Sequence, residues 1–444
     1  MKQTRLITSL TILLFSVCQT LHAQLIVCEN DSTGLIPLID LGPGYYEGYQ
    51  GGLFLDGSNF ENPAGQHFKK GKNFAKNLQP LDSLGNINYD GGTVLMGGFG
   101  PSLPGHMMDE FVPVVRDTTD DVYFTNICFD AINMGAGGKG LDYAIGEDSN
   151  KYWNNMEKKI AEKGYTVSQL QVGWMYFNDK YDSTGTQSFP ETPNHIRDNL
   201  VTYLHMLKNH FPNMKIMFVS GRHYGGYADS TLEQFPAIGE PASYWNNWSV
   251  KWLIEDQITG DPDLKYFGAN IKSPFLTWGP YYWTDGAEPR ATDGRSYTCE
   301  EFSSEDGFHL DEETYVDDAD YLMQHVYNSE FSKYYVKDGT KWTDCVPYLD
   351  SLRQQTDYVT INPTGITLYP NPASDIVNVY RHNVHGKVYA IEIYNEMGQL
   401  IHKEESSGEV WNTIPVDVEF LANGLYVLRV KIEDVWMSER FLKQ

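Results

Sequence analysis

The sequence predicts an α/β domain, a three-layer parallel sheet flanked by helices, followed by a small C-terminal all-β Ig-like sandwich. First, short apolar runs alternate with amphipathic segments over most of the chain. Second, residues 366–444 instead alternate apolar and polar side chains with period two. Third, the composition changes near residue 350, upstream of which Trp, Tyr and Gly are frequent. Alternating strands and helices favour a parallel sheet, whereas period-two segments separated by turns favour an antiparallel sandwich.

Four apolar runs have the length and composition of strands covered on both faces. They span residues 93–100, 122–129, 169–177 and 215–221. Segments 150–164 and 195–211 carry apolar residues at three- and four-residue spacing, which is typical of amphipathic helices. Residues 231–249 lack this pattern and are interpreted as a long connection over the sheet. In such an architecture, sites form at the carboxyl ends of the strands.

The amino terminus has the three-part order of a secretory signal peptide. Basic residues precede the apolar run LITSLTILLFSV and small residues follow it, which predicts a signal peptide over 1–23. No later stretch approaches the ~20 apolar residues that a membrane-spanning helix needs, so no transmembrane segment is expected in the mature chain. A lipoprotein anchored through Cys18 is the alternative, although Val17 is a poor residue before a lipidated cysteine. The α/β domain is predicted over 24–350.

The mature chain is strongly acidic. Removal of the signal peptide takes away Lys2 and Arg5 and no acid, so the formal charge moves from −26 to −28. Such a surface repels phosphate backbones and anionic lipids. Nucleic acid is therefore excluded as an expected partner.

Four cysteines remain after cleavage, and none stands in a metal-binding spacing. They are Cys28, Cys128, Cys299 and Cys345. An oxidising compartment predicts one or two disulfides among them, and the sequence leaves three pairings open.

The period-two segments of residues 366–444 are separated by the turn signals NPAS, NEMG and LANG. The ordered motifs TGITLYPNPASD, IEIYNEMGQLI, LANGLYVLRV and RFLKQ closely resemble the type A C-terminal sorting domain of the type IX secretion system of Bacteroidota. The resemblance implies handling by that machinery, export through the periplasm and across the outer membrane, and a secreted or cell-surface location. A generic Ig-like accessory module is the alternative. Residues 351–365 are interpreted as a linker.

The segment SSEDGFHLDEET, late in the α/β domain, places Asp306 three residues before His309. In a loop or first helical turn, this spacing puts both side chains on one side, where the carboxylate can hold the imidazole Nδ1–H. Such a pair needs a serine. The strand 93–100 leads through glycines to Ser102 and a helix start, an order that exposes a nucleophile. The alternatives are that Ser102 caps the helix, or that Ser58 in DGSN is the nucleophile, although no buried strand leads into it.

Two further segments could form an oxyanion hole with this serine. The glycine loop 133–143 follows the second strand and offers backbone N–H groups that could face an anion. Asn178 follows the third strand and offers a side-chain amide. Donors at the ends of successive strands can converge on one anionic oxygen. A flexible loop and a turn cap are the alternative interpretations.

The order Ser, Gly, Asn and Asp-x-x-His resembles the SGNH (GDSL-like) hydrolase superfamily over roughly residues 90–325, in an uncharacterised secreted bacterial subgroup. The sequence GPS at 100–102 replaces the usual Gly-Asp-Ser. FND at 177–179 lacks the glycine that usually precedes it, whereas DGFH at 306–309 matches the last block.

The resemblance implies a role for each matched residue. Ser102 would attack an ester carbonyl, His309 would transfer the proton, and Asp306 would orient His309. The second-block glycine falls on Gly137, with Gly138 as a near equivalent. The N–H groups of Ser102 and Gly137 and the Asn178 side chain would hold the oxyanion.

Three other segments carry candidate binding residues. The aromatic stretch 278–286 could stack on sugar rings or pack in the core, and GRHYGGY at 221–227 could reach the same edge of the sheet or serve the fold. The acidic stretch 311–320 lacks the order of a calcium loop and is interpreted as a helix start, so no metal and no cofactor are assigned.

These observations predict a secreted serine hydrolase that cleaves a carboxylic ester, with an O-acyl group on a carbohydrate as the substrate class considered first. The alternative is a non-catalytic, surface glycan-binding protein on the same fold. A metal-dependent hydrolase is disfavoured because the sequence lacks clusters of His and Asp ligands.

Overall fold

The computed structural model describes residues 30–89, 91–117, 122–123, 125–179, 187–268, 271–303, 305–337, 365–369, 371–373, 376–382, 388–409 and 413–444. The predicted signal peptide, Cys28, Cys345 and residues 351–364 of the predicted linker lie outside these ranges. Gly365, which the sequence assigned to the linker, begins the first strand of the C-terminal part.

Five parallel strands form the central sheet, in the order β4-β3-β5-β6-β7. They are β3 (Val94–Phe99), β4 (Phe129–Asn133), β5 (Leu170–Tyr176), β6 (Ile216–Ser220) and β7 (Phe275–Trp278). Every strand residue except Asn133 is buried, as expected when helices cover both faces of a sheet. This strand order is that of flavodoxin-like folds, in which ligands bind where the order reverses, here between β3 and β5.

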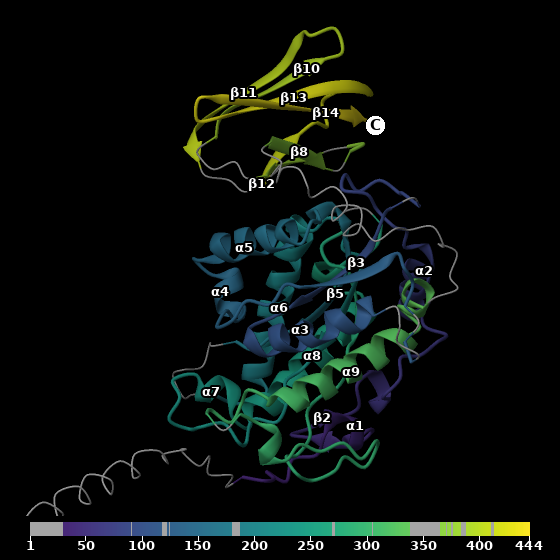
Figure 1. The fold of residues 1–444 in the computed structure, drawn as a ribbon, viewed down its shortest axis with the longest axis vertical. Helices are drawn as coiled ribbons and strands as arrows, with labels where there is room; N and C mark the ends of the chain where they lie inside the picture. The colour runs from purple at the N-terminus through teal and green to yellow at the C-terminus, as the bar shows by residue number, and fades with distance from the viewer. Residues whose placement is uncertain are drawn as a thin grey trace, which may run out of the picture.

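Two layers of helices cover the sheet (Figure 1). On one face α3 (Ser102–Arg116) packs against α9 (Glu312–Asn328). The other face carries α4 (Leu141–Ile145), α5 (Ser149–Glu162), α6 (Glu191–His210) and α8 (Ala242–Thr259). Smaller elements are α1 (Leu38–Leu41), β1 (Tyr45–Tyr46), β2 (Tyr49–Gln50), α2 (Gln66–Asn77), α7 (Phe235–Ile238) and α10 (Lys333–Val336). The predicted three-layer α/β architecture is confirmed.

The second predicted strand, 122–129, is wrong in position. Strand β4 begins at Phe129, and upstream of it Val122 is 64% exposed and Ile127 is 46% exposed. The apolar run 122–129 was predicted as the strand because β4 itself contains Asp130, and a charged residue is unexpected in a buried strand. The Asp130 carboxylate is neutralised by Arg116 at 2.7 Å, so the charge can be buried.

The predicted long connection over 231–249 is also wrong, since it contains α7 and the first half of α8. Helix α8 is buried on nearly every side and its apolar residues surround the helix, so the sequence lacks amphipathic periodicity. The acidic stretch 311–320 is a helix start, as interpreted. The Asp311 carboxylate accepts a hydrogen bond of 2.7 Å from the Thr314 N–H at the beginning of α9.

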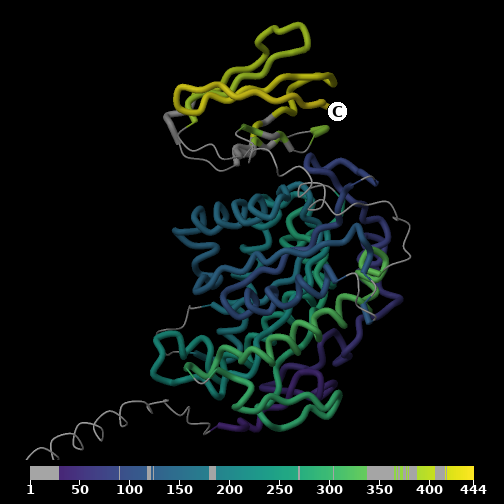
Figure 2. Tube along the Cα trace, in the orientation of Figure 1, coloured from purple at the N-terminus to yellow at the C-terminus, as the bar shows by residue number. Residues whose placement is uncertain are grey.

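The C-terminal part forms two antiparallel sheets, ordered β11-β10-β13-β14 and β12-β9-β8. The strands are β8 (Gly365–Tyr369), β9 (Ile376–His382), β10 (Val388–Asn395), β11 (Leu400–Glu409), β12 (Thr413–Asp417), β13 (Gly424–Ile432) and β14 (Val435–Lys443). One apolar core joins the sheets, with Val379 from one and Ile393 and Leu428 from the other. Figure 2 shows the chain of this yellow-green part apart from the chain of the α/β domain, and its core is a separate cluster of buried residues.

Cys128 and Cys299 are both disulfide-bonded. Across the ranges that the structure describes, no helix combines the length and the apolar character that a bilayer crossing requires.

His325 in α9 should make stability depend on pH. Its Nε2–H donates to the Trp278 carbonyl at 2.9 Å, and burial lowers its pKa from 6.5 to about 4. Between these pH values the unfolded chain binds a proton that the folded chain does not, so the free energy of unfolding falls as the pH drops. We expect His325→Gln, which keeps a donor for the carbonyl, to remove roughly 1–3 kcal/mol of that fall. Urea unfolding of both proteins across this window measures it, and parallel pH profiles would contradict it.

Candidate active site

Ser102 stands at the carboxyl end of β3, as the first residue of α3. Gly100 makes the sharp turn before it, with a φ of +145°, and a Cβ there would lie 2.2 Å from the Tyr176 carbonyl oxygen. Pro101 occupies the helix cap position, and no side chain caps the helix. The alternative that Ser102 serves as a cap is therefore wrong.

The Ser102 side chain instead meets a histidine from the far end of the domain. Ser102 Oγ lies 2.7 Å from His309 Nε2, and His309 Nδ1 lies 2.6 Å from Asp306 Oδ2. Because a carboxylate only accepts, Nδ1 carries the ring proton and Nε2 is free to accept the hydroxyl proton. The side chains of His309 and Asp306 are 26% and 20% exposed, so both are accessible to solvent.

Asp306 is held by the loop it belongs to. Its Oδ1 accepts the N–H groups of Phe308 at 3.2 Å and His309 at 3.1 Å. Partial burial raises the pKa of the Asp306 carboxyl, but hydrogen bonds from His309 and Phe308 outweigh it and hold that pKa below its ordinary value. The group is thus an anion at neutral pH, as a partner of an imidazolium must be.

Two of the predicted oxyanion donors, Gly137 and Asn178, follow the strands on either side of β3. Gly137 follows β4, and a Cβ built on it would be 4.0 Å from the Ser102 Cβ, so its backbone borders the serine. Gly138, the alternative, has a φ of +68° with open space beside it. The N–H of Ser102, at the first position of α3, has no partner within the helix.

Asn178 lies two residues beyond β5 and is partly exposed. Its carbonyl accepts the Leu141 N–H at 3.1 Å, which joins the glycine loop to the end of β5. Among the described residues its side-chain amide makes no hydrogen bond. The next residue, Asp179, is buried and accepts a hydrogen bond from Asn199, which anchors the turn.

Other predicted candidates do not reach this edge. Ser58 bonds locally, donating to the Phe60 carbonyl at 2.7 Å, so it is a surface turn as interpreted. The sugar-stacking alternative for 278–286 is wrong because the aromatic rings of this segment are buried. Arg222, His223 and Tyr224 are also buried rather than at the rim, and His223 Nε2 bonds Asp318 Oδ2 at 2.6 Å.

Further residues near this edge were not predicted from the sequence. Asn133 links this loop to α3, and Lys159 of α5 donates to the Gly135 carbonyl. His106 lies exposed one helical turn after Ser102, with its ring centroid 6.2 Å from that of His309. Only the four-residue spacing from Ser102 could have indicated His106.

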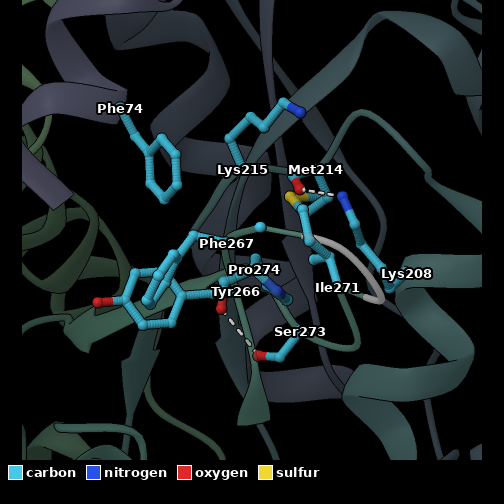
Figure 3. A pocket seen from close by; sticks show the side chains of 10 residues that line it. Phe74, Lys208, Met214, Lys215, Tyr266, Phe267, Ile271, Ser273 and Pro274 are labelled. Carbon is cyan, nitrogen blue, oxygen red and sulfur yellow. Dashed lines mark hydrogen bonds between the residues drawn. The ribbon is translucent and has the colours of Figure 1, made fainter. Parts of the chain in front are cut away.

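A cavity of about 110 Å³ lies elsewhere, beside Lys215 and Pro274 at the amino ends of β6 and β7 (Figure 3). In it the Lys208 ammonium donates to the Met214 carbonyl at 2.8 Å, and burial, with the nearby charge of Lys215, lowers the pKa of Lys208 to about 7. The cavity lies at the amino ends of the strands, whereas Ser102 lies at their carboxyl ends, so the cavity is not part of the candidate site.

Within the described ranges, no three His, Cys, Asp or Glu side chains are grouped so that they could hold a metal ion.

Comparison with known proteins identifies the C-terminal part. Residues 367–444 match the family described as "Secretion system C-terminal sorting domain". The chain is therefore exported, to the cell surface or into the medium, as predicted from the motifs of that part. No curated protein matches the sequence. The resemblance of the α/β domain to SGNH hydrolases stays a prediction.

Likeness to solved structures is slight. An engineered protein is 11% identical, with a TM-score of 0.17, over 76% of this chain and 58% of that chain. The endo-beta-1,4-mannanase from Thermotoga petrophila is 10% identical, with a TM-score of 0.18, over 68% and 73%. Bacteroides uniformis beta-glucuronidase 2 is 10% identical, with a TM-score of 0.22, over 81% and 48%. This chain thus spans little more than half of the engineered protein, and TM-scores this low carry no argument about its fold or activity.

The loop of Asp306 and His309 should depend on Gly307. This residue has a φ of +67°, and a Cβ there would lie 1.9 Å from the Tyr227 carbonyl oxygen. We expect Gly307→Ala to displace the loop and to lower both the melting temperature and the rate at which a fluorophosphonate labels Ser102. Gly294→Ala is the matched control, because Gly294 has a φ of +76° with no atom within 4 Å. It should cost only about 1 kcal/mol of strain, and equal effects of the two substitutions would contradict the argument.

Proposed function

We propose that this protein is an exported serine hydrolase that cleaves carboxylic esters. The observation that carries the proposal is the hydrogen-bonded chain from Ser102 through His309 to Asp306, with both distances below 3 Å. A serine, a base and an orienting carboxylate in this geometry suffice to activate a hydroxyl for nucleophilic attack.

The reaction follows from the position of each proton. As Ser102 Oγ attacks the ester carbonyl carbon, its proton passes to His309 Nε2, and Asp306 stabilises the imidazolium. The tetrahedral intermediate collapses when His309 returns that proton to the leaving alcohol, which leaves an acyl group on Ser102. Water then attacks the acyl carbon while His309 accepts its proton. The carboxylic acid leaves, and the proton on His309 restores the Ser102 hydroxyl.

Backbone geometry supports an oxyanion hole beside the serine. The Ser102 N–H lies at the amino end of a 15-residue helix, where the helix dipole favours negative charge. Gly137 borders the serine from β4 and Asn178 follows β5, the strands on either side of β3. Three donors arranged around one oxygen would stabilise the negative charge that develops in the transition state.

The substrate class that we propose is an O-acylated carbohydrate outside the cell. Export by the sorting domain and an open, partly exposed catalytic pair suit a large extracellular substrate. The non-catalytic glycan-binding alternative gains no support from the aromatic segment 278–286, because its rings are buried.

Substitution of the relay should abolish turnover. We expect Ser102→Ala and His309→Ala to lower kcat for p-nitrophenyl acetate by at least ~10³-fold, and Asp306→Asn to lower it strongly with the fold intact. Ser58→Ala, at the rival serine, should leave kcat unchanged. Equal turnover in Ser102→Ala and in the unmutated protein, or none in either, would refute the esterase and leave a binding protein.

Asn178 should stabilise the transition state rather than the bound substrate. Its removal by Asn178→Ala should lower kcat by ~10²–10³-fold, because one oxyanion donor is lost, while KM changes little. Asn178→Gln, which keeps the amide on a longer side chain, should recover part of the rate. A rise in KM with unchanged kcat would instead assign Asn178 to substrate binding.

A further inference from the structure

Asn133 is the last residue of β4, and its side chain makes three hydrogen bonds. Its Nδ2 donates to the Gly105 carbonyl at 2.8 Å and to Asp109 Oδ1 at 2.7 Å, both in α3. Its Oδ1 accepts the Gly135 N–H at 2.8 Å, in the glycine loop. One amide thus ties the loop to the helix that begins with the nucleophile.

The loop is also fixed from two other sides. The Ala136 N–H donates to the Gly100 carbonyl at 2.7 Å, which joins the loop to the turn before the serine. Lys159 holds the Gly135 carbonyl from α5. Gly137 is the first residue beyond these ties, and it is the residue that borders the serine.

Backbone contact between loop and helix is close. A Cβ on Gly135 would lie 2.5 Å from the Gly105 Cα, so two glycines allow the chains to touch. Because the two segments lie so close, the short side-chain amide of Asn133 can bond both the Gly105 carbonyl and the Gly135 N–H. Aspartate could replace only the acceptor, and its carboxylate would face the Gly105 carbonyl and Asp109.

We infer that Asn133 is a positioning residue that sets the distance between the Gly137 N–H and Ser102 Oγ. Donors to an oxyanion act only within about 2.7–3.1 Å of it, and a displacement of about 1 Å can cost ~10²-fold in rate. Asn133 touches neither substrate nor reacting atoms, so it acts through Gly135 and the loop that follows. Its effect on rate rests on the proposed esterase activity, whereas its hold on the loop does not.

The test uses the mature full-length chain and three readouts. In Asn133→Ala we expect kcat for p-nitrophenyl acetate to fall about 10- to 100-fold with KM nearly unchanged. The rate of fluorophosphonate labelling of Ser102 should fall in parallel. Amide hydrogen exchange over residues 134–138 should become faster, while that of β3 stays the same.

A control and an exchange of partners guard against general loss of structure. Asn213→Ala removes a similar tie, from Nδ2 to the Ser168 carbonyl at 2.6 Å at the opposite edge of the sheet, and should leave all three readouts unchanged. Asn133→Asp should be impaired and Asp109→Asn near normal. The double exchange Asn133→Asp with Asp109→Asn reverses donor and acceptor between α3 and β4. Its kcat should be at least 3-fold higher than that of Asn133→Asp alone, as roughly expected for one restored hydrogen bond.

The outcomes separate the two proposals. Unchanged kcat in Asn133→Ala, or a fall equal to that of Asn213→Ala, overturns the positioning inference while the esterase stands. Absence of turnover in the unmutated protein overturns the esterase, and hydrogen exchange then decides alone whether Asn133 holds the loop. Unchanged exchange over residues 134–138 overturns that hold as well.

Discussion

The hydrogen bond between Ser102 and His309 joins residues 207 positions apart, and the candidate site depends on it. It exists because α3 and α9 pack on the same face of a parallel sheet. Helix α3 starts from the carboxyl end of β3, and the segment before α9 returns to the same edge. Any change that separates these helices would break the hydrogen bond between Ser102 and His309 without altering either residue.

Another hydrogen-bonded pair of histidine and aspartate in this domain has the opposite consequence. His223 and Asp318 are hydrogen-bonded at 2.6 Å, yet their side chains are only 1% and 0% exposed. Tyr176 occupies the other ring nitrogen of His223, so no substrate hydroxyl can reach it. Exposure and a free Nε2 facing a serine, rather than the His–Asp contact itself, distinguish the pair at His309.

Close backbone approach recurs wherever the site is built. Gly100 and Gly307 both adopt positive φ, and at both a Cβ would collide with a carbonyl oxygen. Gly105 and Gly135 let α3 and the glycine loop touch. These contacts fix Ser102, His309 and the glycine loop in place without a ligand, which is what the proposed stabilisation of a transition state requires.

The sequence alone determined the C-terminal sorting domain, the fold class and the residue types of the proposed relay, because these follow from local patterns of period, turn residues and motif order. It misplaced β4 and missed α8, since a buried Asp130 and a helix apolar on all sides both hide their periodicity. Only the tertiary structure decided that Ser102 rather than Ser58 meets His309, that the aromatic segment is core, and that Asn133 joins loop to helix. Such contacts span distant parts of the chain, and sheet order and helix packing create them.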